Sequence, residues 1–120
     1  MIGIRGVYEV AIPVHDLERA ETFYRDVLGL EVGLRDATRP WVFMRAGGLG
    51  GMIVLQETPG EWAPMHFAFT VDSADVARAA ETLQAKGVPI VGPMRHDWIP
   101  ATSVYFADPD GHDLELCAAG

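Results

Sequence analysis

Two stretches of this sequence, about 57 residues apart, match each other without a gap. Residues 9–16 read EVAIPVHD and residues 66–73 read HFAFTVDS. Each stretch alternates its apolar side chains as a half-buried strand does, and each precedes a segment with helical apolar spacing. A repeat of this length predicts a fold built from two copies of one supersecondary unit.

The order of predicted elements is the same in the two halves. A helix over residues 17–29 begins after Asp16, a good N-cap, and ends at Gly29, and a helix over 74–87 follows Ser73 as its cap. Alternation and turn signals predict strands over residues 7–14, 31–36, 41–46, 51–57, 65–71, 89–95, 102–107 and 112–117. The predicted fold class is therefore α+β, a single domain over 1–120 with βαβββ modules at about 5–57 and about 64–118.

Charge and composition exclude several classes of partner. The formal net charge is −8 and the sequence pI is about 4.7, so we expect neither a nucleic-acid nor an anionic-membrane partner. No segment reaches the roughly 20 apolar residues of a membrane span, and the N-terminal apolar run is too short for a signal peptide. With Cys117 as its one cysteine, the chain forms no internal disulfide, and we expect a cytoplasmic protein.

Three chemically active side chains share one face of the predicted strands. Alternation directs Phe67 and Phe69 toward the helix and His66 away from it. The same parity directs Glu9 and Glu115 away from the helix of their own half. Each of these residues alone reads as a solvated or structural group, but carboxylate and imidazole groups together are the usual ligands of divalent metals. The shared face predicts a metal site made of Glu9, His66 and Glu115.

The phrases DLERAETFYRDVLG and DPDGHDLEL, at residues 16–29 and 108–116, resemble the vicinal oxygen chelate superfamily. That superfamily includes glyoxalase I, bleomycin-resistance proteins, fosfomycin-resistance enzymes and extradiol dioxygenases. The resemblance covers nearly the whole chain and implies paired βαβββ modules that form curved mixed sheets around a cleft.

The resemblance also implies metal ligands at up to four positions, at the start of each module's first strand and within its last strand. Those positions fall on Glu9, His66, Glu115 and Val54, and Val54 cannot bind a metal; Gln56, with the same parity, is the alternative if the alignment is shifted. The remaining Glu-His-Glu set makes Fe(II)-dependent oxygen chemistry less favourable and suits harder ions. The expected cofactor is one divalent ion per site, chosen from Mn, Zn, Ni, Mg or Fe.

Two classes of function remain open at this point. In the first, the chain is a metal-dependent lyase, isomerase or related enzyme that stabilises an oxyanion on a small molecule with vicinal oxygens, with Glu9 or Glu115 as the base. In the second, it is a metal-free protein that binds a small molecule or an antibiotic, as the bleomycin-resistance members do, in a cleft lined by tryptophans. Fosfomycin resistance is a weaker alternative, because only five residues follow Glu115. Candidate substrate contacts are Trp41, Trp62, Gln56, Arg95, His96 and Trp98.

The repeat also predicts how chains assemble. Glu9 and His66 hold equivalent positions in the two modules, and each module leaves its first strand as an edge that is usually paired or covered. A two-fold or pseudo-two-fold pairing of the first module of one chain with the second module of the other brings these two positions face to face across one cleft. We therefore expect a homodimer with two sites, each taking Glu9 from one chain and His66 with Glu115 from the other.

Overall fold

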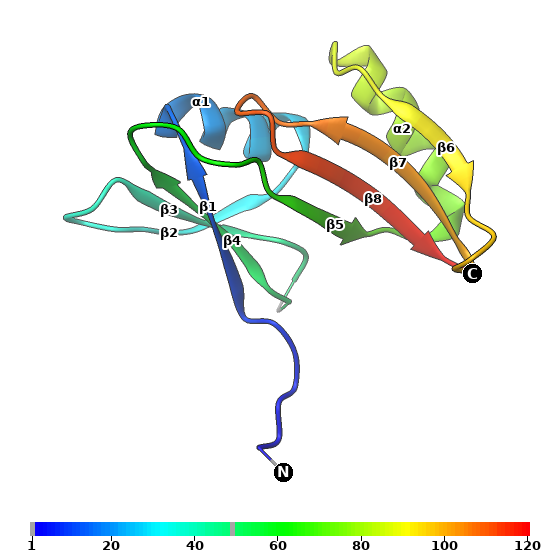
Figure 1. The fold of residues 1–120 in the computed structure, drawn as a ribbon, viewed down its shortest axis with the longest axis horizontal. Coiled ribbons are helices and arrows are strands. Elements are labelled where there is room, and N and C mark those ends of the chain that lie inside the picture. Colours follow the sequence, from blue (N-terminus) through cyan, green and yellow to red (C-terminus); the bar gives the residue numbers. More distant parts are fainter. Residues whose placement is uncertain (1, 49) are drawn as a thin grey trace. The chain divides into compact units, whose positions relative to one another are not determined.

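The computed structural model describes residues 2–48 and 50–120. The chain divides into two compact units, residues 1–62 and 63–120, and each is described by itself (Figure 1). Among the described residues, no helix combines the length and the apolar character that a membrane crossing requires.

The first unit is one four-stranded mixed sheet with a helix on one face. Its elements are β1 (Glu9–Val14), α1 (Leu17–Thr22), the π-helical turn η1 (Phe23–Val27), β2 (Glu31–Arg35), β3 (Trp41–Arg45) and β4 (Met52–Glu57). The strand order is β1-β4-β3-β2. The first strand pairs in parallel with the last, and the other pairs are antiparallel.

The second unit repeats this plan. It contains β5 (His66–Thr70), a short 3-10 turn η2 (Ser73–Asp75), α2 (Val76–Ala85), β6 (Val91–Arg95), β7 (Ala101–Ala107) and β8 (Asp113–Ala119). The strand order is β5-β8-β7-β6, and β5 again pairs in parallel with the last strand. The two units confirm the predicted α+β fold of two βαβββ modules.

The core of each unit lies between its sheet and its helix. In the first unit, α1 packs against β3 and β4, and alternate strand residues are fully buried beneath it. In the second unit, α2 packs against β6, β7 and β8. The strand residues that form these two cores are Ile12, Val14, Val42, Met44, Ile53 and Leu55, and Val104, Phe106, Leu114 and Leu116.

The helix ends confirm one predicted cap and correct the other. Asp16 caps α1 through Oδ1, which accepts from the Arg19 backbone N–H at 3.0 Å, and Gly29 has the left-handed φ of 77° that follows a helix end. Ser73 is not the cap of α2, because its Oγ donates to the Ala119 carbonyl at 3.2 Å. Asp75 takes the N-cap position without a side-chain bond, and the 3-10 turn precedes α2.

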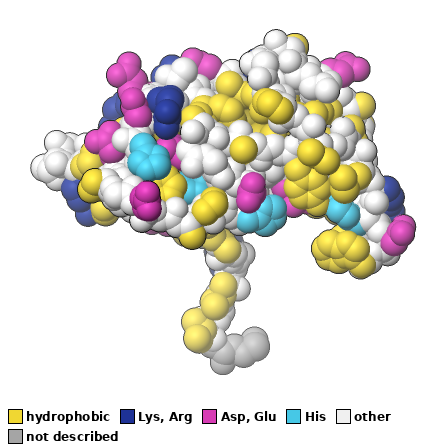
Figure 2. All heavy atoms as spheres, turned by 45° about the horizontal axis from the view of Figure 1, so that its top comes forward, with side chains coloured by type: hydrophobic (Ala, Val, Ile, Leu, Met, Phe, Trp, Pro, Cys, Tyr) yellow, Lys and Arg dark blue, Asp and Glu magenta, His cyan; other side chains and the backbone are white. Residues whose placement is uncertain are grey.

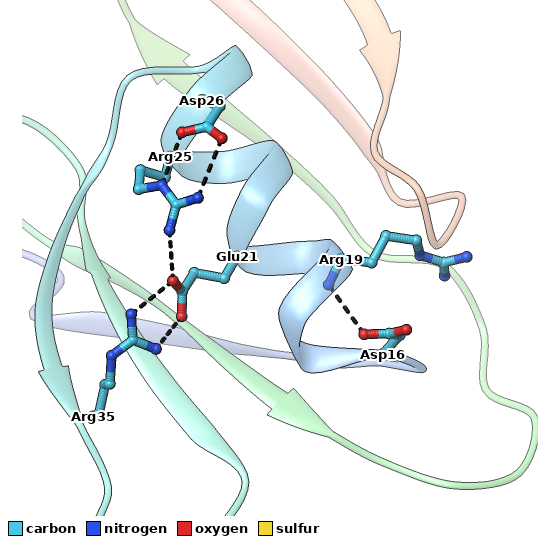
Figure 3. A network of polar contacts seen from close by, with 6 residues as sticks. All are labelled: Asp16, Arg19, Glu21, Arg25, Asp26 and Arg35. Atoms are coloured by element: carbon cyan, nitrogen blue, oxygen red, sulfur yellow. Dashed lines mark hydrogen bonds and ion pairs between the residues drawn. The ribbon is translucent and has the colours of Figure 1, made fainter.

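A network of charged side chains ties α1 to strand β2 (Figure 3). Glu21, on the buried side of α1, accepts two bonds from the Arg35 guanidinium, the Nη2 bond at 2.7 Å, and a third from Arg25 Nη1 at 2.8 Å. The hydrogen bonds from Arg35 lower the pKa of Glu21 below its ordinary value, although partial burial acts in the opposite direction. The ionised form of Glu21 therefore favours the folded state.

Candidate functional site

The face of the second sheet that lies opposite α2 carries most of the chemically active side chains. We call this surface the open face of the second unit. Strand alternation and the registers of β5, β7 and β8 establish which side chains lie on this face. Its residues are His66, Ala68, Thr70, Ser103, Tyr105, Asp113, Glu115 and Cys117.

A chain of polar contacts crosses three strands on this face. The His66 Nε2 atom of β5 lies 3.4 Å from Glu115 Oε1 of β8. The second carboxylate oxygen, Oε2, accepts from Ser103 Oγ of β7 at 2.5 Å. The Glu115 side chain is 12% exposed and that of His66 is 56% exposed. The carboxylate is thus held at the base of the surface, and the imidazole stands at its edge.

The hydrogen bonding of His66 suits a metal ligand. Its Nδ1 lies 3.1 Å from the Asp113 backbone carbonyl, and a carbonyl oxygen can only accept. An N–H at Nδ1 satisfies this contact and leaves the Nε2 lone pair of the neutral ring facing the Glu115 carboxylate. Metal-binding histidines commonly donate their second ring N–H to a backbone carbonyl in this way. A divalent cation, or a proton on Nε2, relieves the repulsion between these two electron-rich atoms.

Three donors of the kinds that bind metals do not gather within either unit. Over residues 2–48 and 50–120, no group of three His, Cys, Asp or Glu side chains forms a ready metal site. The second unit supplies His66 and Glu115 together. Glu9 lies in the first unit, exposed at the start of β1. The predicted three-residue set is therefore divided between the two units.

Strand registers establish which residues of the first unit correspond to these groups. Ala11 pairs with Val54 as Ala68 pairs with Glu115, so Val54 holds the counterpart position of Glu115. Glu9 corresponds to His66 in the same way, because each begins the first strand of its sheet. Val54 is fully buried. At these two register positions the first unit therefore offers one possible ligand, the Glu9 carboxylate, where the second offers two.

The same registers allow the face of the first sheet that lies opposite α1 to be compared with the open face of the second unit. Phe43 pairs with Val54 in the place where Tyr105 pairs with Glu115. Trp41 pairs with Gln56 in the place where Ser103 pairs with Cys117. At these two pairs the first unit therefore presents two aromatic rings, a valine and an amide where the second presents hydroxyl, carboxylate and thiol groups. The counterpart of the His66 imidazole remains the Glu9 carboxylate.

Two of the three predicted substrate contacts of the first unit lie side by side. Trp41 and Gln56 are paired across β3 and β4, and both are half-buried. The Arg39 guanidinium lies 3.8 Å from the centre of the Trp41 ring, a cation–π contact that holds the indole in place. Trp62, another candidate, instead stacks on His15 with ring centres 4.4 Å apart.

The remaining predicted contacts lie at the end of strand β6 and just after it, where Arg95 is the last residue of the strand. Trp98 is 81% exposed, with its ring centre 5.4 Å from that of His96. The His96 Nε2 atom lies 2.9 Å from the Tyr105 hydroxyl, which connects this segment to the open face. Arg95 pairs with Thr102, and its guanidinium donates to the Gly120 carbonyl. In this arrangement Arg95 joins β6 to the residue that follows β8.

Sequence reasoning missed two residues of the open face, Ser103 and Tyr105. The alternation in the segment SVYF, residues 103–106, places both on the face opposite Val104 and Phe106. The alternation alone does not show that these two residues lie near Glu115. That conclusion needs the strand register, which sets Tyr105 opposite Glu115. His112, in the turn before β8, is fully buried, and its Nδ1 accepts from the Met65 backbone N–H at 2.9 Å.

Comparisons with known proteins place the chain among relatives of the same fold. A glutathione transferase, FosA, from Serratia marcescens is 30% identical over 118 residues, covering 94% of this chain and 80% of that protein. A metallothiol transferase, FosB, from Staphylococcus haemolyticus is 28% identical over 120 residues, covering 94% and 83%. An integron cassette protein from the mobile metagenome of the Halifax Harbour sewage outfall is 43% identical with a TM-score of 0.91, covering 96% of this chain and 99% of that one.

The family model that describes the Glyoxalase/Bleomycin resistance protein/Dioxygenase superfamily matches residues 6–116. The match spans both units, from before β1 into β8. It agrees with the repeated βαβββ order, and with the resemblance in the helix and terminal-strand phrases. The chain therefore belongs to the Glyoxalase/Bleomycin resistance protein/Dioxygenase superfamily.

Proposed function

We propose that the protein is a metal-dependent enzyme that acts on a small molecule with two adjacent oxygens. The observation that carries this proposal is the pairing of His66 Nε2 with Glu115 Oε1 at 3.4 Å, with Nδ1 of the same ring against a backbone carbonyl. Glu9 is the third ligand in this proposal, and the Val54 position contributes none. Three protein ligands leave positions at which substrate oxygens can bind.

The side chains of the chain divide the remaining tasks. A bound divalent ion supplies Lewis acidity for an oxyanion that develops on the substrate. The Glu9 or Glu115 carboxylate moves a proton, since each can accept one when it is not fully engaged as a ligand. Trp41, Gln56 and Trp98 contact the rest of the substrate, the two indoles by stacking on its apolar portion. Arg95, also a predicted contact, pairs with Thr102 on the α2 side of the sheet and donates to the Gly120 carbonyl, so it is left out of this proposal.

The donor set and the relatives narrow the chemistry further. Two carboxylates and one imidazole form a hard ligand set, which favours Mn²⁺ or Mg²⁺ over softer ions. Lyase, isomerase and addition reactions all use a stabilised oxyanion. The names of FosA, a glutathione transferase, and FosB, a metallothiol transferase, favour addition of a thiol to an electrophilic substrate within this group.

We also propose that two chains share each site, Glu9 coming from one chain and His66 with Glu115 from the other. Support comes from the division of these ligands between units and from β1 and β5, each an edge of its own sheet. The segment before β1 exposes apolar side chains, which Figure 2 shows along a projecting arm. Such exposure is typical of an interaction surface. The arm carries Ile2, Ile4, Val7 and Tyr8.

Titration of metal-stripped protein with Mn²⁺, Mg²⁺, Zn²⁺ and Ni²⁺ in a calorimeter tests the metal site. We expect about one ion per chain, no binding by His66→Ala and severely weakened binding by Glu115→Ala. Glu81→Ala is the matched control, because Glu81 is an exposed carboxylate on α2, which packs on the opposite face of the sheet. Normal binding by both site variants contradicts the proposal.

A second candidate, ligand binding without a metal, is favoured by the exposed aromatic segment next to the open face. Trp98 is 81% exposed and Ile99 is 40% exposed, and such side chains suit an apolar ligand. This candidate is supported if the wild-type protein binds none of the four ions and if an aromatic antibiotic quenches its tryptophan fluorescence. Trp98→Ala then removes the quenching.

A further inference from the structure

A buried hydroxyl group controls the orientation of the Glu115 carboxylate. Ser103 is fully buried on β7, and its Oγ–H donates to Glu115 Oε2 at 2.5 Å. This is the length of a strong hydrogen bond from a hydroxyl to a charged oxygen. The other oxygen, Oε1, is the one that lies 3.4 Å from His66 Nε2. The two oxygens of Glu115 therefore have different partners.

The two units provide an internal comparison for this contact. The counterpart of Glu115 is Val54 and the counterpart of Ser103 is Trp41, as the strand registers establish. The hydroxyl and the carboxylate thus occur together in one unit and are both replaced in the other. In the first unit, where Val54 needs no hydrogen-bond donor, the position of Ser103 is taken by an indole side chain.

We propose that Ser103 is a positioning residue that fixes the Glu115 carboxylate, so that Oε1 alone faces His66 and a shared ligand. This inference rests on the proposed metal site for its consequence, although the orientation itself needs no metal. With Oε2 occupied by the serine hydroxyl, Glu115 binds an ion through one oxygen. Hydrogen-bonded partners of ligating carboxylates commonly set their orientation and their affinity for the ion.

Removal of the hydroxyl tests the consequence. In Ser103→Ala we expect Mn²⁺ affinity, measured by calorimetry, to fall roughly 10- to 100-fold, as for other partners of metal ligands. Ser103→Thr retains a hydroxyl on the same Cβ, and we expect it to recover most of the affinity. Thr102→Ala is the control, because Thr102 is the neighbouring hydroxyl residue on the opposite face of β7. Circular dichroism and thermal melting establish that each variant is folded.

A second measurement reads the orientation without any metal. In protein with selectively labelled glutamate, nuclear magnetic resonance reports the chemical-shift difference between the two diastereotopic γ protons of Glu115. We call the signals distinct when this difference is large, as in a fixed side chain, and averaged when rotation of the side chain makes it small. We expect distinct signals in the wild type and in Thr102→Ala, and averaged signals in Ser103→Ala. If Ser103→Thr does not fold, this comparison of wild type with Ser103→Ala still decides the inference.

The two measurements separate failure of the inference from failure of the proposed function. Unchanged Mn²⁺ affinity and an equally ordered Glu115 in Ser103→Ala overturn the positioning role, whatever the wild type binds. Wild-type protein that binds no Mn²⁺ overturns the metal proposal instead. In that event, averaged Glu115 signals in Ser103→Ala still support the positioning role, and distinct signals overturn it.

Discussion

Replacing Glu21 with glutamine removes the charge that joins α1 to strand β2. In the wild type, this carboxylate accepts two bonds from Arg35 and one from Arg25. The Glu21 side chain is 9% exposed, whereas those of Arg35 and Arg25 are 58% and 45% exposed. Water can therefore reach the two guanidinium groups after the substitution, and the loss falls mainly on the contact with Arg35.

The expected magnitude follows from these contacts. A hydrogen bond to a charged group contributes about 1.5–3 kcal/mol, and the exposure of Arg35 places this contact at the lower end of that range. The exposed i,i+4 pair with Arg25 adds only about 0.3–0.5 kcal/mol. We therefore expect Glu21→Gln to lower the free energy of unfolding by about 2 kcal/mol at pH 7. For a chain of this size, that loss lowers Tm by roughly 6–12 °C.

The effect depends on pH in a direction that the structure fixes. The pKa of Glu21 is lowered in the folded state, first by the bonds from Arg35. Its stabilisation is complete above the unfolded pKa of about 4.5 and is lost as the pH falls through the lower folded value. The difference between wild type and Glu21→Gln should therefore be constant near neutral pH and shrink in acid.

Urea unfolding at pH 7 and over an acid series measures both features. Glu18→Gln is the matched control, because it removes the same charge from an exposed position of α1. We expect the control to change stability by less than about 0.5 kcal/mol. Equal losses for the two variants, or a loss that persists unchanged at low pH, would refute the reasoning.

Three further predictions follow from contacts described above. In mixed dimers of Glu9→Ala and His66→Ala chains, one intact metal site should reappear per heterodimer; verified heterodimers that bind no metal, or a monomer in light scattering, contradict the shared site. Asp16→Ala should cost about 1 kcal/mol in chemical unfolding through loss of the α1 cap, and an unchanged midpoint would show that the cap contributes nothing. His112→Ala should cost about 2–4 kcal/mol, because it leaves a cavity and an unpaired Met65 backbone N–H; a thermal melt close to that of wild type argues against this.

Local signals in the sequence predicted the elements and most of their boundaries. Asp16 and Gly29 mark the ends of the first helical segment because their chemistry acts within one turn of chain. The π-helical turn Phe23–Val27 was not predicted, because it is a change of hydrogen-bond partner that the apolar spacing does not record. Ser73 was misassigned as a cap because its hydroxyl donates to the backbone carbonyl of Ala119, 46 residues away in the sequence.

The candidate site was predicted less completely than the fold, for a related reason. Parity along a single strand was enough to select His66 and Glu115, which the structure brings together. Contacts between strands need a register, and a sequence without pairing information does not provide one. Ser103 and Tyr105 reach Glu115 and its surroundings only through the pairing of β7 with β8, so their association with the carboxylate was not foreseen.

The matched registers of the two sheets bear on how such a protein changes over evolutionary time. In a repeated module every position has a counterpart on an equivalent backbone, so one module can carry a functional group while the other carries a different side chain at that position. Val54, fully buried at the register position that Glu115 holds in the other sheet, shows that the same backbone position accepts either a core side chain or a carboxylate. The pair also guides protein engineering, because the surroundings of Glu115 show which neighbouring groups a carboxylate introduced at Val54 would need.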